Sequence, residues 1–257
     1  MNLSKNTILI TGGAAGIGFE LARQLCRRGN KVIITGRDQA KLDSALTQLP
    51  DVTIIKSDAG EIRDIETLHQ RIVRDFPELN VLINNAGIMR DINFHKDERS
   101  LEDLTREIEI NLCGPIRLTK KFLPQLKARP EAAIVNVSSG LAFVPLPISP
   151  IYCATKAALH SFTQSLRVQL KNTKVKVFEL APPATDTPLL RHGNPSDLKG
   201  VSIMSVEAMV TAAMKGFEKD NFEIRPGQAN QLKFMSRLAP EFILKQLSRS
   251  VDRMLAS

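Results

Sequence analysis

The chain has 257 residues, 43% of them apolar, which is enough for one α/β domain with a sizeable buried core. Its 35 Lys and Arg against 27 Asp and Glu give a net charge of +8, but with one Tyr, no Trp and no nucleic-acid-binding motif we expect no nucleic-acid partner. No apolar run is as long as a membrane span, the polar start is not a secretory signal, and the three Cys and four His lack metal-ligand spacing, so we expect a cytoplasmic protein without a metal site.

Short apolar runs rich in Val and Ile alternate along the chain with segments whose apolar residues recur at helical spacing. The runs predict strands at 7–11, 31–35, 52–55, 81–84, 133–138, 175–180 and 222–224. The segments between them predict helices at 18–28, 39–48, 62–76, 101–126, 152–170 and 206–217. This alternation predicts a single α/β domain over residues 1–257, a Rossmann-like, doubly wound parallel β-sheet of about seven strands flanked by helices.

Two stretches depart from this alternation. The polar stretch 188–204 follows the sixth predicted strand and contains two Gly and a Pro besides Pro188, so it is interpreted as a substrate lid. The stretch 228–257 carries apolar residues at helical intervals among Lys and Arg, and predicts a C-terminal helical extension of two short helices broken near Pro240. Two interpretations of this basic tail stay open: it folds over the core or into a subunit interface, or it docks on an anionic membrane surface.

The first predicted strand ends in a glycine-rich turn, Thr-Gly-Gly-Ala-Ala-Gly-Ile-Gly, and a helix follows directly. Glycines allow the backbone to turn sharply and to approach a pyrophosphate, whose charge is met by free N–H groups at the start of the helix. A glycine-rich turn alone is a weak signal, but its place between a strand and a helix strengthens it. The residues predicted to bind a dinucleotide here are Gly12, Ala14, Ala15, Gly16, Ile17 and Gly18.

Four further motifs follow in chain order. Asn84-Asn85-Ala86-Gly87 closes the fourth strand, Asn111 lies on the next helix, Ser138-Ser139 closes the fifth strand, and Tyr152-Cys-Ala-Thr-Lys156 starts the helix after it. With the TGxxxGxG turn, these motifs resemble those of the short-chain dehydrogenase/reductase family over residues 6–226. The resemblance implies an oxidoreductase that transfers a hydride between a nicotinamide and a carbonyl or secondary alcohol, with the catalytic residues Asn111, Ser139, Tyr152 and Lys156.

The pair Tyr152 and Lys156 is also informative without the resemblance. The two residues lie four apart, so on a helix their side chains share one face. A free phenol has a pKa of about 10, and a neighbouring ammonium together with an oxidised nicotinamide favours the phenolate, so Tyr152 is the expected general acid and base. The resemblance adds that Lys156 binds the nicotinamide ribose, that Ser139 holds the substrate oxygen, and that Asn111 kinks its helix and binds a water on the proton relay.

The end of the second strand bears on the choice of cofactor. Members of the family that prefer NAD have an acidic residue there, whereas this chain has Gly36 followed by Arg37. A guanidinium binds a 2′-phosphate that a carboxylate would repel, so NADP(H) is predicted over NAD(H), although Asp38 could still face a ribose. The resemblance implies further cofactor contacts at Asp58, Ala59, Asn85, Ala86, Gly87, Tyr152, Lys156, Pro182, Thr185 and Thr187.

Two alternatives to this enzyme stay open. The chain could be a catalytically quiet dinucleotide-binding sensor or interaction module, or a reductase of a lipid-like substrate that docks on a membrane through its tail. The complete set of four catalytic residues argues against the first. The resemblance also implies a homodimer paired through the helices at 101–126 and 152–170, with a tetramer as the alternative, and a small carbonyl or alcohol substrate that the sequence does not identify.

Overall fold

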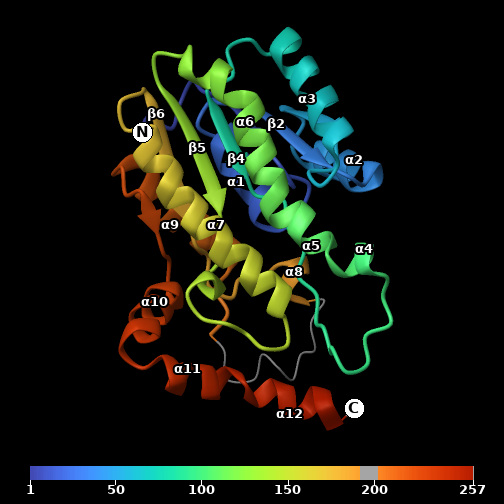
Figure 1. Cartoon of the computed structure of the whole chain (residues 1–257). Helices are drawn as coiled ribbons and strands as arrows, with labels where there is room; N and C mark the ends of the chain where they lie inside the picture. The colour runs from blue at the N-terminus through green and yellow to red at the C-terminus, as the bar shows by residue number, and fades with distance from the viewer. Residues whose placement is uncertain (192–201, 257) are drawn as a thin grey trace.

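The protein folds around one sheet of seven parallel strands in the order β3-β2-β1-β4-β5-β6-β7. The computed structural model describes residues 1–191 and 202–256, without the side chains of Arg249, Arg253 and Ala256. Strand order reverses where β1 lies between β2 and β4, and helices cover both faces of the sheet (Figure 1). The predicted doubly wound, Rossmann-like sheet is confirmed, and a reversal of this kind opens a crevice at the carboxyl ends of the strands.

The strands form where Val and Ile dominate, because β-branched side chains suit a sheet that is buried on both faces. Every residue of β1, β4 and β5 is buried. All seven predicted strands are found, with ends that differ from the prediction by at most one residue. They are β1 (Thr7–Ile10), β2 (Lys31–Gly36), β3 (Val52–Lys56), β4 (Val81–Asn84), β5 (Ala132–Val137), β6 (Val175–Leu180) and β7 (Glu223–Ile224).

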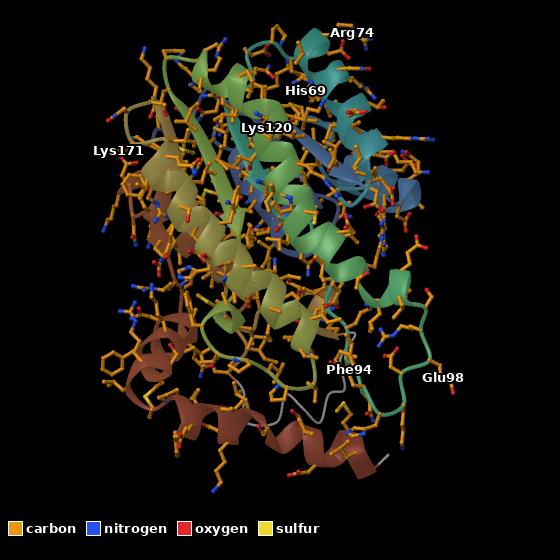
Figure 2. All side chains as sticks on the ribbon, viewed as in Figure 1. His69, Arg74, Phe94, Glu98, Lys120 and Lys171 are labelled. Atoms are coloured by element: carbon orange, nitrogen blue, oxygen red, sulfur yellow. The ribbon has the colours of Figure 1, made fainter. Side chains whose placement is uncertain are left out.

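Helices pack on the two faces of the sheet through separate apolar clusters. The first layer consists of α1 (Gly16–Cys26), α2 (Gln39–Gln48) and α9 (Val206–Glu218). The second consists of α3 (Ile62–Asp75), α6 (Gly114–Lys127) and α7 (Pro150–Gln169). In the second layer, the rings of His69 on α3 and Phe122 on α6 meet edge-on with centroids 5.1 Å apart, where Figure 2 shows the two helices side by side. With both faces covered, the sheet is reached by a ligand only at the ends of its strands.

The prediction of one continuous helix at 101–126 is wrong. The structure divides this stretch into α4 (Leu101–Leu104), α5 (Arg106–Ile108), the π-helical turn η1 (Glu109–Cys113) and α6. Close packing explains the irregular turn, because a Cβ added at Gly114 would lie 2.4 Å from the carbonyl oxygen of Ala59. The helix backbone therefore rests against the chain that leaves β3, and η1 accommodates this approach and carries the buried Asn111.

The C-terminal extension forms three helices rather than the two predicted: α10 (Gln228–Leu238), α11 (Pro240–Leu247) and α12 (Arg249–Ala256). The break at Pro240 is confirmed. The second break was not predicted and falls at Ser248, whose hydroxyl donates to the carbonyl oxygen of Leu244, while the Ser250 hydroxyl donates to that of Leu247. Local side-chain bonds of this kind compete with a continuous helix.

The predicted lid at 188–204 lies mostly outside the described residues, since 192–201 are not described. Its described flanks are α8 (Pro188–Arg191) and the segment at Met204, which forms a parallel bridge with Thr185. These flanks place both ends of the stretch beside the carboxyl end of β6.

Candidate active site

The glycine-rich turn joins β1 to α1 at the carboxyl edge of the sheet. Gly12 has a φ of +64°, and a Cβ there would lie 2.8 Å from the Ala86 Cα, so only glycine allows the two backbones to approach this closely. Gly18 is buried, and its Cβ would lie 2.4 Å from the Gly12 carbonyl oxygen. Gly12 therefore shapes the turn, while Gly18 allows α1 to pack beneath it.

The first turn of α1 offers unused hydrogen-bond donors. Its N-cap, Ala15, makes no side-chain capping bond, and the first turn contains no acidic residue. Free N–H groups at the positive end of a helix form a site for a pyrophosphate. Ala15 is exposed, whereas Ala14, Gly16 and Ile17 are half-buried, so these predicted residues border the surface as a bound dinucleotide would require.

A pocket of about 130 Å³ adjoins this turn and collects predicted residues that follow four strands, β1 to β4. Six of its lining residues were predicted to bind the cofactor, namely Gly12, Arg37, Asp58, Ala59, Ala86 and Gly87. The remaining five were not among the predicted cofactor contacts, although Gly36 was noted at the end of the second strand: Thr35, Gly36, Ser57, Ile88 and Ile110. Thr35, Gly36, Ser57 and Ile88 lie at or just after predicted strand ends, and Ile110 precedes Asn111 on η1.

Arg37 is the free cation at the rim of this pocket. The neighbouring Asp38 is occupied as the N-cap of α2, where its carboxylate accepts a hydrogen bond from the Lys41 amide at 3.2 Å. Arg37 is exposed, and no ion pair of its side chain is found among the described residues. One oxygen of Asp38 is thus used by the helix cap and the other lies 4.0 Å from the Lys41 Nζ, while the guanidinium of Arg37 has no such partner among the described residues.

Two other predicted contacts are partly occupied by the protein itself. The Asp58 carboxylate pairs with Arg106 at 2.9 Å and also accepts from the Gly60 amide. The side-chain amide of Asn85 donates to the carbonyl oxygens of Thr11 and Gly12, both at 3.0 Å. Asn85 therefore fixes the glycine-rich turn, so any cofactor contact there falls to its backbone or its side-chain oxygen. Thr11, which sequence reasoning missed, accepts from the Asn85 and Ala86 amides.

Tyr152 and Lys156 lie on the first turns of α7 and are both buried, with 6% and 4% of their surfaces exposed. The Lys156 Nζ lies 5.6 Å from the centre of the Tyr152 ring and donates to the Val137 carbonyl oxygen at 2.9 Å. A Cβ added at Gly87 would lie 3.5 Å from the same Nζ, so the loop after β4 borders it. One helix thus carries both groups to the end of β5.

Burial governs the acid–base properties of this pair. It raises the pKa of Tyr152 to about 12, an effect that the Ser139 hydroxyl partly offsets. Burial also lowers the pKa of Lys156 to about 8. The acidic phenol expected from the sequence is therefore not a property of the chain alone, because desolvation of the phenolate raises the pKa of Tyr152 more than the Ser139 hydroxyl lowers it.

The two adjacent serines have different partners. Ser138 donates its hydroxyl to the buried carboxylate of Glu179, which also contacts His160 on α7. The Ser139 hydroxyl accepts a hydrogen bond from the Leu141 amide at 3.1 Å. Its interaction with the Tyr152 hydroxyl lowers the pKa of Tyr152. This difference agrees with the prediction of Ser139, rather than Ser138, as the catalytic serine.

Asn111 lies within the turn η1 and is fully buried. Its side chain accepts from the Ile88 amide at 2.9 Å and donates to the Ile88 carbonyl oxygen at 2.8 Å, which holds the loop after β4. It also donates to the Thr155 hydroxyl on α7 at 3.2 Å. Asn111 therefore ties the predicted catalytic helix to the predicted cofactor loop.

The segment after β6 returns to the glycine-rich turn. The Thr187 Cγ2 lies 3.3 Å from where a Cβ of Gly16 would be, and Thr185 and Thr187 are both buried. The Pro182 carbonyl oxygen accepts from the Gly140 amide at 2.8 Å, next to Ser139. The predicted residues of this segment thus lie between the turn and the predicted catalytic serine.

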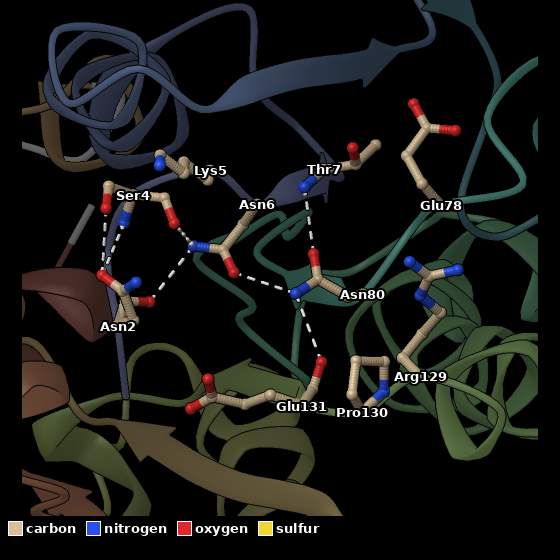
Figure 3. A pocket seen from close by; sticks show the side chains of 10 residues that line it. All are labelled: Asn2, Ser4, Lys5, Asn6, Thr7, Glu78, Asn80, Arg129, Pro130 and Glu131. Carbon is tan, nitrogen blue, oxygen red and sulfur yellow. Dashed lines mark hydrogen bonds between the residues drawn. The ribbon is translucent and has the colours of Figure 1, made fainter.

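Two other polar clusters lie outside this site. His160, Glu179 and Glu223 bring potential metal-binding atoms within 4.8 Å of one another, but Lys233 and Arg225 already pair with Glu223. At the opposite, amino ends of the strands, Figure 3 shows a polar pocket of about 240 Å³ around Asn80. The Asn80 side chain accepts from the Thr7 amide and donates to Asn6, so it joins β1 to the start of β4. Both clusters have structural roles.

Comparison with known proteins gives consistent matches. A family model described as short chain dehydrogenase matches residues 6–197. The chain is 42% identical to the uncharacterized oxidoreductase DltE of Bacillus subtilis (strain 168), over 96% of this chain and 98% of that protein. A short chain dehydrogenase from Burkholderia cenocepacia, solved in complex with NADP, has a TM-score of 0.82 and 26% identity over 96% of this chain and 99% of its own. The 3-ketoacyl-(acyl-carrier-protein) reductase from Brucella melitensis, complexed with NADH, has a TM-score of 0.76 and 27% identity over 84% and 91%.

Proposed function

The chain belongs to the short-chain dehydrogenase family, and from this premise we propose that it is an NADP(H)-dependent oxidoreductase acting on a carbonyl or secondary alcohol. The observation that carries the proposal is the convergence of Ser139, Tyr152 and Lys156 at the end of β5, beside a glycine-shaped turn and its pocket. The similar structures do not indicate which cofactor this chain prefers, because the Burkholderia cenocepacia structure holds NADP and the Brucella melitensis structure holds NADH. The preference for NADP(H) rests on Arg37.

The residues present fit a dinucleotide. The close approach of Gly12 to Ala86 packs the glycine-rich turn against the loop after β4, where both residues line the pocket, and the uncapped start of α1 supplies N–H donors to phosphate. Arg37 would bind a 2′-phosphate, and Asp58, Ala59 and Gly87 line the pocket where the adenosine would lie. Lys156 has two ammonium protons left after its bond to the Val137 carbonyl oxygen, and these would hold the nicotinamide ribose.

The chain's own groups account for the proton. When bound, the reduced nicotinamide supplies the hydride that forms the new C–H bond at the carbonyl carbon. The Ser139 hydroxyl holds the substrate oxygen, and the Tyr152 hydroxyl donates the proton that this oxygen needs as its negative charge develops. The Lys156 ammonium, protonated at neutral pH with its pKa of about 8, favours the resulting phenolate until a proton returns. In alcohol oxidation each transfer runs in reverse.

The function is tested with purified full-length protein and a panel of aldehydes and ketones. We expect NADPH to bind at least about tenfold more tightly than NADH, since a guanidinium–phosphate contact contributes about 1.5 to 3 kcal/mol. Fluorescence titration of each cofactor measures this ratio, and NADPH absorbance measures turnover with each carbonyl. Tight binding of NADPH without oxidation across the panel would instead favour the sensor or interaction module.

The C-terminal extension favours a second candidate, a reductase that works at a membrane surface. Among the described residues no helix is long and apolar enough to span a membrane. Phe234, Leu238 and Phe242 follow one another at intervals of four on α10 and α11, and each is more than 60% exposed. Arg237 and Lys245 lie exposed beside them. Apolar side chains flanked by basic ones are typical of a helix that lies on an anionic lipid surface.

Liposome co-sedimentation tests this candidate. The wild-type chain is expected to sediment with anionic vesicles and not with zwitterionic ones, and the triple variant Phe234→Ser, Leu238→Ser, Phe242→Ser is expected to lose at least about tenfold in binding. Phe94→Ser is the matched control, because Phe94 is 64% exposed on a loop remote from α10 (Figure 2). Unchanged sedimentation of the triple variant refutes membrane docking, and a change in its oligomeric state would assign the three side chains to the predicted subunit interface.

We propose one domain over residues 1–257, a cytoplasmic location and a homodimer, each on the sequence features described above. The name of the Bacillus subtilis relative assigns no reaction, so the substrate is to be found by the carbonyl panel.

A further inference from the structure

Glu107 is a fully buried carboxylate beside the candidate active site. It lies on α5, one turn before Asn111, and 0% of its surface is exposed. Neither of its carboxylate oxygens has a hydrogen-bond partner among the described residues. Buried polar atoms are nearly always paired, so a carboxylate kept without a hydrogen bond calls for an explanation other than stability.

One cation faces this carboxylate. The Arg90 Nε lies 3.6 Å from a Glu107 oxygen and is itself buried without a hydrogen bond. The other nitrogens of Arg90 are committed elsewhere, at 2.9 Å from the Asp103 carboxylate and in bonds to the carbonyl oxygens of Asp103 and Leu104. The charge of Glu107 is therefore compensated only in part by Arg90, and its field extends to other neighbours.

Those neighbours are the groups at the start of α7, against which α5 packs. Burial has the largest effect on the pKa of each of these groups, and the charge of Glu107 adds to it at Tyr152 and Cys153, raising both pKa values further. At Lys156 burial lowers the pKa, and the charge of Glu107 partly offsets this decrease. Arg99, on the same loop as Arg90, is the other cation whose charge acts on Glu107. Burial has the largest effect and raises the pKa of Glu107 itself, against the lowering effects of the Arg90 amide and guanidinium and of the Arg99 charge, so its carboxyl ionises later than an exposed one.

We propose that Glu107 is a positioning residue of the reaction, an ionised carboxylate whose charge holds Tyr152 and Lys156 in their protonated forms as the pH rises. The proposal rests on the role proposed above for Tyr152. A negative charge nearby opposes formation of the phenolate and favours the ammonium. Glu107 thereby sets the upper pH limit for carbonyl reduction, which needs the phenol, and the lower limit for alcohol oxidation, which needs the phenolate.

The sequence provides a direct measurement of this effect. Tyr152 is the only tyrosine and the chain has no tryptophan, so the near-ultraviolet absorbance of phenolate reports one residue without any substrate. Stopped-flow pH jumps of the full chain record this absorbance before alkaline unfolding, which circular dichroism follows. Glu107→Gln is expected to lower the midpoint of Tyr152 ionisation by about half a pH unit or more, about a threefold change in the phenolate-to-phenol ratio.

The matched control is Glu102→Gln, which removes an exposed carboxylate from the adjacent helix α4 and is expected to leave the midpoint unchanged. If Glu107→Gln does not fold, Arg90→Gln replaces it, and the uncompensated carboxylate should then raise the midpoint. Equal midpoints in wild type and Glu107→Gln, or in wild type and Arg90→Gln, overturn the proposal. Because no turnover is measured, this result is independent of the carbonyl panel that tests the enzyme.

Glu107→Gln also has a kinetic consequence that a purely structural role would not produce. With a carbonyl found in the panel, the alkaline limb of the reduction profile should move to lower pH, while oxidation of the product alcohol at neutral pH should rise by about threefold. A uniform loss of both activities at every pH would contradict the proposal.

Discussion

Tyr152→Phe is expected to lower turnover by about a hundred- to ten-thousandfold, the usual contribution of a positioned general acid. The substitution removes only the hydroxyl, and the ring keeps its place in a position that is 6% exposed, so the fold should be retained. NADPH binding should stay within about twofold of wild type, because Tyr152 is one of many predicted cofactor contacts and those of the glycine-rich turn, Arg37 and Lys156 are all retained. Single-turnover absorbance and fluorescence titration measure the two quantities.

Cys153→Ala provides the control for this experiment. Cys153 is the next residue on α7 and is equally buried, and its sulfur contacts the backbone of Leu146 rather than any predicted catalytic group. We expect its turnover to stay within about threefold of wild type, with a modest loss of thermal stability. Undiminished turnover of Tyr152→Phe would refute the assignment of Tyr152 as the acid, and an equal loss in Cys153→Ala would attribute the effect to disturbed packing of α7.

The sheet was predictable because its strands are short, apolar and bounded by turn residues. Buried parallel strands read as continuous runs of Val and Ile, which is why the ends of β4 and β6 were predicted without error. Helical periodicity was less informative at 101–126. The apolar spacing continues through η1, so only the contact of Gly114 with the chain after β3 shows why the helix is interrupted.

In the candidate site, too, some residues had a sequence signal and others had none. Residues in sequence motifs, such as Tyr152 and Lys156, were found because their spacing on one helix face is itself the signal. Glu107 gave no such signal, because a glutamate in a helix is normally solvated, and its burial depends on α7 and the loop after β4 packing over it. The raised pKa that Tyr152 has in the chain alone gave no sequence signal either, since the cost of burying a phenolate depends on tertiary packing.

Arg37→Asp is expected to reverse the cofactor preference. Loss of the guanidinium should weaken NADPH binding by about ten- to a hundredfold, and the new carboxylate would repel the 2′-phosphate further. The same carboxylate could accept hydrogen bonds from the ribose hydroxyls of NADH, so binding of NADH should be maintained or improved. Arg37 is exposed, and its side chain has no ion pair among the described residues, so the substitution should cost little stability.

Arg63→Asp separates this local effect from a general change in charge. Arg63 is exposed on α3, is absent from the pocket lining, and undergoes the same change of two charge units. Its effect on NADPH binding should be at most about twofold in buffered salt, where distant surface charges are screened. An Arg37→Asp variant that still binds NADPH more tightly than NADH would show that the 2′-phosphate is recognised elsewhere. We do not expect the 2′-phosphate to be recognised elsewhere in this turn. The next side chain, Asp38, is acidic and would repel a phosphate, and its carboxylate already caps α2.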